Sequence, residues 1–163
     1  LVTHDHSDHN QIGRVTQKPG CLVVTAEQAL AGGQYHAFQA DGVRVQALPA
    51  ANQHHPIDRC VGYLLTLDDV KVYCAGDTST LPQMAELQEK KLDYALLPID
   101  GIYNMDAAEA ARCAELIGAR HTIPIHTDPH DEDGICMSKV AAFCCDGRLV
   151  LQHGEEISLC AAR

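Results

Sequence analysis

After three residues the chain carries the sequence HDHSDH, which spans His4–His9. In an extended segment His4 and His6 point to the same side, because the side-chain period is two, and Asp8 and His9 follow where the chain can turn. Imidazole and carboxylate together suit divalent zinc, manganese or iron, and packing them this closely without a metal costs desolvation and repulsion. The motif therefore predicts a metal site. The interleaved aspartates argue against a plain polar tail or an artificial tag.

Two more residues could bind metal. Asp77 follows the apolar segment Val70–Cys74 in a Gly-Asp-Thr turn, where a carboxylate can face cations, although aspartate also serves as a turn residue or helix N-cap. His126 ends the apolar run Thr122–Ile125, so its imidazole stands at a strand end, where sites in α/β folds collect. A loop histidine without a ligand role is the alternative for His126.

The opening motif resembles the His-x-His-x-Asp-His signature of the metallo-β-lactamase superfamily. Within it the chain resembles the metal-dependent hydrolases related to the ascorbate-6-phosphate lactonases. The other matching segments follow in the expected order along nearly the whole chain: Leu48-Pro49-Ala50, His55-Pro56, Gly62-Tyr63, Ala75–Thr78, Leu96–Ile99, Met105-Asp106 and Ile123–His126.

The resemblance implies an α/β fold, an αββα sandwich in which two β-sheets lie face to face with helices outside. It also implies two divalent metal ions on loops at one edge. The first ion would be held by His4, His6 and a third histidine, the second by Asp8, His9 and His126, with Asp77 between them.

The third histidine is the least defined ligand, because His54 and His55 are adjacent and successive side chains usually diverge. We choose His55, since the family pattern has proline after the histidine and Gly-Tyr further on. His54 remains the alternative.

The elements that must position these residues alternate between short apolar runs and helix-like segments, which indicates an α/β protein. Helices are expected over Asp106–Ile117, from Thr25 to Gly33, and over about Pro82–Lys90. Strands are expected at Cys21–Thr25, Val43–Leu48, Val61–Leu67, Val70–Cys74, Tyr94–Leu97, Thr122–Ile125, Arg148–Leu151 and Ile157–Cys160.

The resemblance also has departures. Thr127-Asp128 stand where relatives often carry tyrosine and glycine, and Asp100 stands where glycine is common, so the substrate pocket is expected to differ. Relatives begin with a β-rich segment before the metal motif, and this chain lacks it. We therefore expect one N-terminally incomplete domain over residues 1–163, and either Leu1 is an artificial start of a longer protein or the chain is a trimmed variant with an open sheet edge. An uncovered strand edge invites pairing with another chain, so a homo-oligomer is a candidate assembly.

Composition narrows the partners. With 163 residues, 46% of them hydrophobic, the chain can form one domain with a sizeable core. Its formal net charge of −10 disfavours nucleic acid. No apolar run approaches the roughly 20 residues that span a bilayer, and no signal pattern is evident, so a soluble, cytoplasmic protein is expected. The eight cysteines lack Cys-x-x-Cys spacing and are expected to be buried thiols.

The expected function is hydrolysis of a small ester, lactone or amide. Two divalent cations, zinc first and manganese or iron next, would lower the pKa of a shared water toward about 7 and supply hydroxide. Asp8 and Asp77 are the candidate catalytic residues, since either carboxylate can orient that water and accept its proton. The alternatives are a phosphodiesterase or nuclease of the same superfamily and a metal-binding protein without catalysis.

Overall fold

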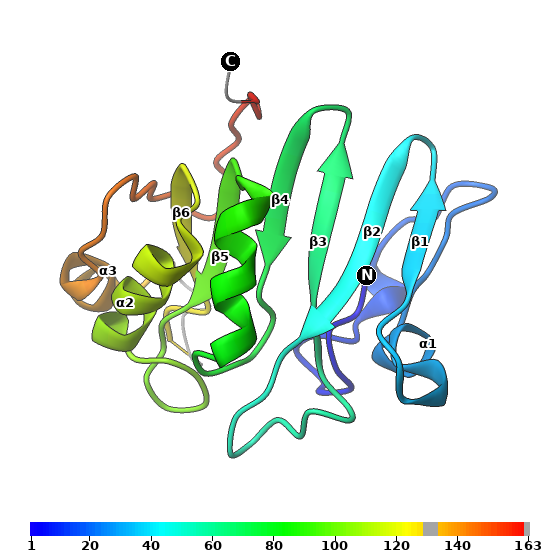
Figure 1. Ribbon diagram of the computed structural model, residues 1–163, viewed down its shortest axis with the longest axis horizontal. Coiled ribbons are helices and arrows are strands. Elements are labelled where there is room, and N and C mark those ends of the chain that lie inside the picture. The colour runs from blue at the N-terminus through cyan, green and yellow to red at the C-terminus, as the bar shows by residue number, and fades with distance from the viewer. Residues whose placement is uncertain (129–133, 162–163) are drawn as a thin grey trace.

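The computed structural model describes residues 1–128 and 134–161, which are arranged around one six-stranded sheet with strand order β1-β2-β3-β4-β5-β6 (Figure 1). The strands are β1 (Ala37–Ala40), β2 (Val43–Pro49), β3 (Val61–Leu67), β4 (Val70–Cys74), β5 (Tyr94–Pro98) and β6 (His121–Ile125). The α-helices are α1 (Ala26–Ala29), α2 (Ala107–Ile117) and α3 (Met137–Ala142), and the 3₁₀ helices are η1 (Ile12–Arg14), η2 (Ala31–Gly33) and η3 (Pro82–Lys90).

The sheet changes direction at β4. Strands β1 to β4 are antiparallel neighbours, whereas β4, β5 and β6 run parallel, with η3 and α2 as their connections. The carboxyl ends of three parallel strands therefore share one edge of the sheet. The loop between β2 and β3 leaves from that same edge, because Pro49 pairs with Val61 while Tyr63 pairs with Cys74.

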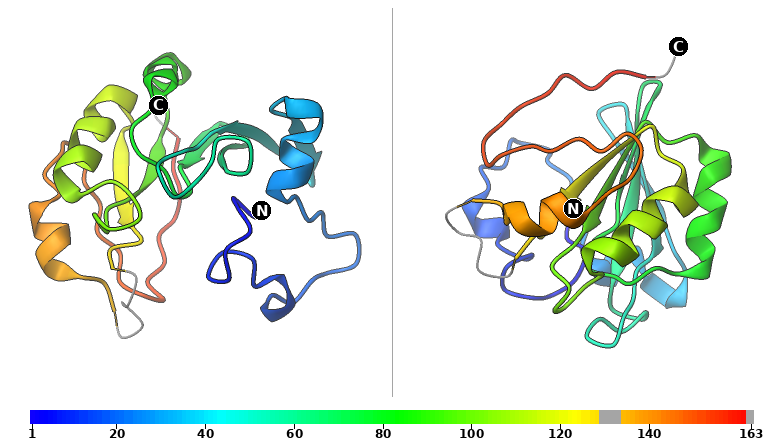
Figure 2. Two further views of the ribbon diagram at one scale, coloured as in Figure 1. Left: turned by 90° about the horizontal axis from the view of Figure 1, so that it is seen from below. Right: turned by 90° about the vertical axis from the view of Figure 1, so that its left-hand side faces the viewer.

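Side-chain alternation divides the core between the two faces of the sheet. Leu64, Tyr73 and Leu97 pack with η3, α2 and α3 on one face. On the other face, Ala47 and Tyr63 pack against α1. Figure 2 shows α2 and α3 grouped at one end of the molecule, and α1 with the N-terminal segment at the other.

Most of the expected elements are confirmed. Val61–Leu67 and Val70–Cys74 form strands with the predicted bounds, and β2, β5 and β6 differ from prediction by one residue at one end. Asp106 caps α2 by accepting a hydrogen bond from the backbone N–H of Glu109 at 2.7 Å. The helix from Thr25 begins with a capping box and continues into η2, and Pro82–Lys90 is helical but 3₁₀.

Three predicted strands are wrong. Cys21–Thr25 is irregular, because the one backbone bond recorded between it and the N-terminal segment, from Val2 N–H to the Val24 carbonyl, does not make a strand pair. Arg148–Leu151 pairs with β6 only through a bridge between Thr122 and Arg148. Ile157–Cys160 does not join the sheet. Three short elements, η1, β1 and α3, were not expected. The α/β class is confirmed, and the residues described form one sheet with helices on both faces where two sheets were expected.

Burial of the cysteines also departs from expectation. Cys60 and Cys113 are buried thiols as predicted, whereas Cys21, Cys144 and Cys160 are exposed. In the part of the chain that the structure covers, no helix has the length and apolar character needed to cross a bilayer.

Gly62 provides a test of how closely β3 and β4 pack. A Cβ at this position would lie 2.9 Å from the Ala75 carbonyl oxygen and 3.0 Å from that of Cys74. We expect Gly62→Ala to lower the free energy of unfolding by about 1–3 kcal/mol, measured by urea denaturation, because backbone atoms must move. Gly13→Ala is the matched control, since nothing lies within 4 Å of a Cβ there. Equal stability of the two variants would contradict this packing.

Candidate metal centre

Backbone contacts hold the N-terminal segment against the sheet edge where β3 begins. Val61 N–H donates to the Thr3 carbonyl at 2.9 Å, and the Tyr63 hydroxyl donates to the Val2 carbonyl at 2.8 Å. These bonds place the next residue, His4, at the edge that also carries the ends of β4, β5 and β6.

Gly76 allows the turn after β4 to approach the same segment. Its φ of +67° is in the left-handed region that favours glycine, and a Cβ would lie 2.9 Å from the Val61 carbonyl oxygen and 3.1 Å from the Thr3 side chain. A hydrogen bond holds the following turn against α2, because the Thr80 N–H donates to the Glu109 carboxylate at 2.8 Å. Asp77 is therefore fixed beside the histidine motif.

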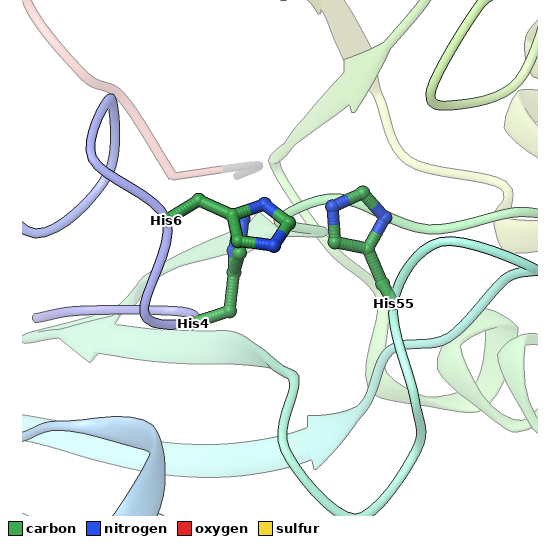
Figure 3. A group of neighbouring side chains, drawn as sticks. All are labelled: His4, His6 and His55. Carbon is green, nitrogen blue, oxygen red and sulfur yellow. The ribbon is translucent and has the colours of Figure 1, made fainter.

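The first group of candidate ligands consists of His4, His6 and His55, whose ligand atoms lie within 4.8 Å of one another. Figure 3 shows the three rings turned toward a common space, two from the N-terminal segment and one from the β2–β3 loop. His4 and His55 are only 2% and 1% exposed. His4 Nε2 is buried with no hydrogen-bond partner among the residues described. Buried polar atoms normally have a partner, and a metal ion would provide one here.

The second group consists of Asp8, His9 and His126, again within 4.8 Å. His9 Nε2 lies 3.3 Å from Asp8 Oδ2, and His126 Nε2 lies 3.8 Å from the same oxygen. His126 has a φ of +45°, a conformation that is strained for a residue with a side chain. In this conformation the imidazole lies with the other ligands at the end of β6.

Asp77 lies between the two groups. Its Oδ2 is 3.4 Å from His55 Nε2 and 3.7 Å from His126 Nε2, and its Oδ1 is 3.4 Å from His9 Nε2. The carboxylate is 4% exposed. Oδ2 thus lies near one histidine of each group, and Oδ1 lies near His9 of the second group.

The structure places His55, and not His54, with His4 and His6. The exposed His54 ring instead contacts Tyr103, with the ring centroids 5.6 Å apart. All seven sequence-predicted residues therefore come together.

Polar contacts at the Nδ1 atoms orient three of the histidines. His4 Nδ1 lies 3.0 Å from Thr3 Oγ1, His55 Nδ1 lies 2.9 Å from Asn52 Oδ1, and His126 Nδ1 lies 2.9 Å from Asp100 Oδ2. Such partners leave Nε2 free to bind a metal. Sequence reasoning noted Asp100 only as a departure from the family and missed Asn52. The position of Asp100 just after a parallel strand is the signal that could have identified it.

Burial and neighbouring charges set the protonation of the centre. Burial, with His9 nearby, lowers the pKa of His4 to about 4, and burial also lowers the pKa of His55, so both are neutral at pH 7. The hydrogen bond to Asp100 raises the pKa of His126 to about 9. Burial opposes ionisation of Asp100, but hydrogen bonds from His126 and the following backbone hold its pKa well below the ordinary value.

A cavity of about 460 Å³ opens beside the second group, lined by Asp8, His9, Asp77 and His126 together with apolar residues such as Leu96 and Ile125. Its size is that of a small-molecule site.

Comparison with known proteins identifies the family of the chain. The family model for the beta-lactamase superfamily domain matches residues 1–126. A relative from Pyrococcus furiosus, named as a UPF0173 metal-dependent hydrolase, is 34% identical, and the match covers 98% of this chain and 80% of the relative. A Methanoregula boonei protein with the same family name is also 34% identical, over 98% of this chain and 76% of its own length.

Solved structures agree. A crystal structure from Parabacteroides distasonis superposes with a TM-score of 0.71 at 25% identity, over 92% of this chain and 74% of that one. The metallo-beta-lactamase fold protein YhfI from Bacillus subtilis has a TM-score of 0.58 at 16% identity, over 90% of this chain and 59% of its own, which shows the shared fold. The chain belongs to the metallo-β-lactamase superfamily, within the group named UPF0173 metal-dependent hydrolases.

Proposed function

We propose that the chain binds two divalent metal ions and hydrolyses a small ester, lactone or amide. His4, His6 and His55 hold the first ion, Asp8, His9 and His126 hold the second, and Asp77 joins them. Zinc is the first choice of metal, and manganese or iron fit the same mixture of imidazole and carboxylate.

The observation that carries the proposal is the position of the Asp77 carboxylate. Ligand atoms about 2.1 Å from a tetrahedral zinc ion are about 3.4 Å apart. Asp77 Oδ2 is 3.4 Å from His55 Nε2 and Asp77 Oδ1 is 3.4 Å from His9 Nε2. Each oxygen thus has the spacing of a ligand that shares an ion with a different histidine, as a bridging carboxylate requires.

The bound ions would supply Lewis acidity and make water a stronger acid. The protein's own part is to hold and move protons. Backbone hydrogen bonding and the neighbouring His9 and His126 hold the pKa of Asp8 below its ordinary value although burial opposes this, so the carboxylate is anionic at neutral pH. Asp8 is the more exposed of the two catalytic candidates, with a side chain 62% exposed, and is the better placed to accept a proton from water.

The substrate is proposed to be a small molecule. The cavity beside the second group has the volume of a small-molecule site, and its apolar wall suits the carbon skeleton of an ester or lactone. The net charge of −10 disfavours a polynucleotide. A homo-oligomer remains part of the proposal.

Metal binding should stabilise the fold. Zinc added to chelator-treated protein is expected to raise the melting temperature, because at a hundredfold excess over Kd one ligand contributes about 2.7 kcal/mol. His6→Ala should reduce this shift while leaving the metal-free stability nearly unchanged, since the His6 side chain is exposed. His36→Ala, which lies outside the centre, should retain the full shift. No change in the melting temperature of the wild-type protein when zinc is added would contradict the proposal.

The two groups can be separated by metal analysis after dialysis. Wild-type protein should retain close to two ions per chain. His126→Ala should lose mainly the second, whereas Asp77→Asn should weaken both, because its two oxygens face different histidines. Retention of both ions by Asp77→Asn with unchanged affinity would rule out the bridging role.

Salt dependence discriminates the small-molecule activity from the phosphodiesterase or nuclease alternative. Turnover of lactones and esters should change little between low and high salt, because direct coordination is poorly screened. Cleavage of a short RNA would require Lys/Arg contacts and should fall steeply with salt. Salt-sensitive RNA cleavage with inert lactones would favour the nuclease. No turnover of any substrate above the metal-only blank would favour a non-catalytic metal-binding protein.

A further inference from the structure

We propose that Asn52 and Asn104 are positioning residues that connect the two groups of metal ligands. The affinity for the second ion would then depend on Asn52, which contacts the first-ion ligand His55. The inference rests on the proposed two-ion centre.

Asn104 joins two buried carboxylates through one amide group. Its Nδ2 donates to Asp77 Oδ2 at 3.1 Å and to Asp100 Oδ2 at 2.7 Å. Asp77 and Asp100 are 4% and 1% exposed. The two hydrogens of the amide serve one carboxylate each. Without them, two buried negative groups would each lose a donor, which is costly in a poorly solvated site.

Asp100 also fixes the loop from which Asn104 projects. Its Oδ1 accepts backbone N–H bonds from Ile102 at 2.6 Å, Tyr103 at 2.7 Å and Asn104 at 3.2 Å. Its Oδ2 faces His126 Nδ1 at 2.9 Å. The same carboxylate thus orients a ligand of the second ion and holds the Asn104 backbone.

Asn52 extends the network to the first ion. Its Oδ1 lies 2.9 Å from His55 Nδ1, and its Nδ2 donates to the Tyr103 carbonyl at 2.8 Å and to Asn104 Oδ1 at 3.4 Å. The order of contacts is therefore His55, Asn52, Asn104, then Asp77 and Asp100, and finally His126. Of the proposed ligands, the only one that Asn52 is recorded to touch is the first-ion ligand His55. An effect of Asn52 on the second ion therefore passes either through Asn104 or through His55 and its neighbour Asp77, and the proposal assigns it to Asn104.

A double-mutant cycle tests this connection by measuring the Kd of each zinc ion in competition with a chelator. Asn104→Ala is expected to weaken binding of the second ion roughly 10- to 100-fold. Asn52→Ala should also weaken the second ion in the wild-type background but have little further effect on it in the Asn104→Ala background. The second ion is identified as the one that His126→Ala loses.

Two more variants serve as controls. Ile102→Ala lies on the same loop with an exposed side chain and should leave both Kd values unchanged. Asn104→Gln keeps the amide donor and should recover part of the affinity that Asn104→Ala loses, which also provides an answer if the alanine variant does not fold. Circular dichroism and melting in chelator report folding independently of metal.

The outcomes separate this inference from the proposed function. If wild-type protein binds fewer than two ions, the two-ion centre itself fails. If wild-type protein binds two ions but the Asn52 and Asn104 effects are additive, or Asn104→Ala matches Ile102→Ala, the connection is wrong while the centre stands.

Discussion

The structure depends on a close approach between the N-terminal segment and the turn after β4. Gly76 has no Cβ, and a side chain there would meet both the Val61 carbonyl oxygen and Thr3. That contact brings His4 and Asp77 together from positions more than seventy residues apart in the chain. A larger residue at position 76 would push the histidine motif away from the Asp77 carboxylate, and the candidate ligands would no longer lie close together.

The sheet topology brings the other residues of the centre together. Because β4, β5 and β6 are parallel, the residues that follow them, Asp77, Asp100 and His126, emerge at one edge. Ligands of an α/β protein commonly bind at this edge. The antiparallel pairing of β2 and β3 returns the loop that carries His55 to the same place. One mixed sheet therefore brings side chains from four separate segments of the chain to the same edge.

The parts that could be predicted from the sequence are those governed by local pattern. Val61–Leu67 and Val70–Cys74 are short apolar runs, and the helix cap at Asp106 and stop at Gly118 follow local rules, so the bounds of these elements were predicted correctly. Arg148–Leu151 and Ile157–Cys160 have strand composition, but a strand also needs a partner, and partners are set by tertiary structure. Likewise, the seven candidate ligands have diagnostic types and spacing, whereas Asn52 and Asn104 are ordinary loop residues whose roles exist only in three dimensions.

Charge explains how so acidic a chain could act on a small anion or a polarised carbonyl. Under the proposed function, two divalent ions bring four positive charges into a centre whose carboxylates, Asp8, Asp77 and Asp100, bring three negative ones. One positive charge therefore remains in the centre before its water ionises, although the molecule as a whole carries −10. The neutral amides of Asn52 and Asn104 preserve that charge, because they orient the ligands without adding charge of their own. A further carboxylate in either place would cancel the excess and reduce the acidifying effect of the ions on water.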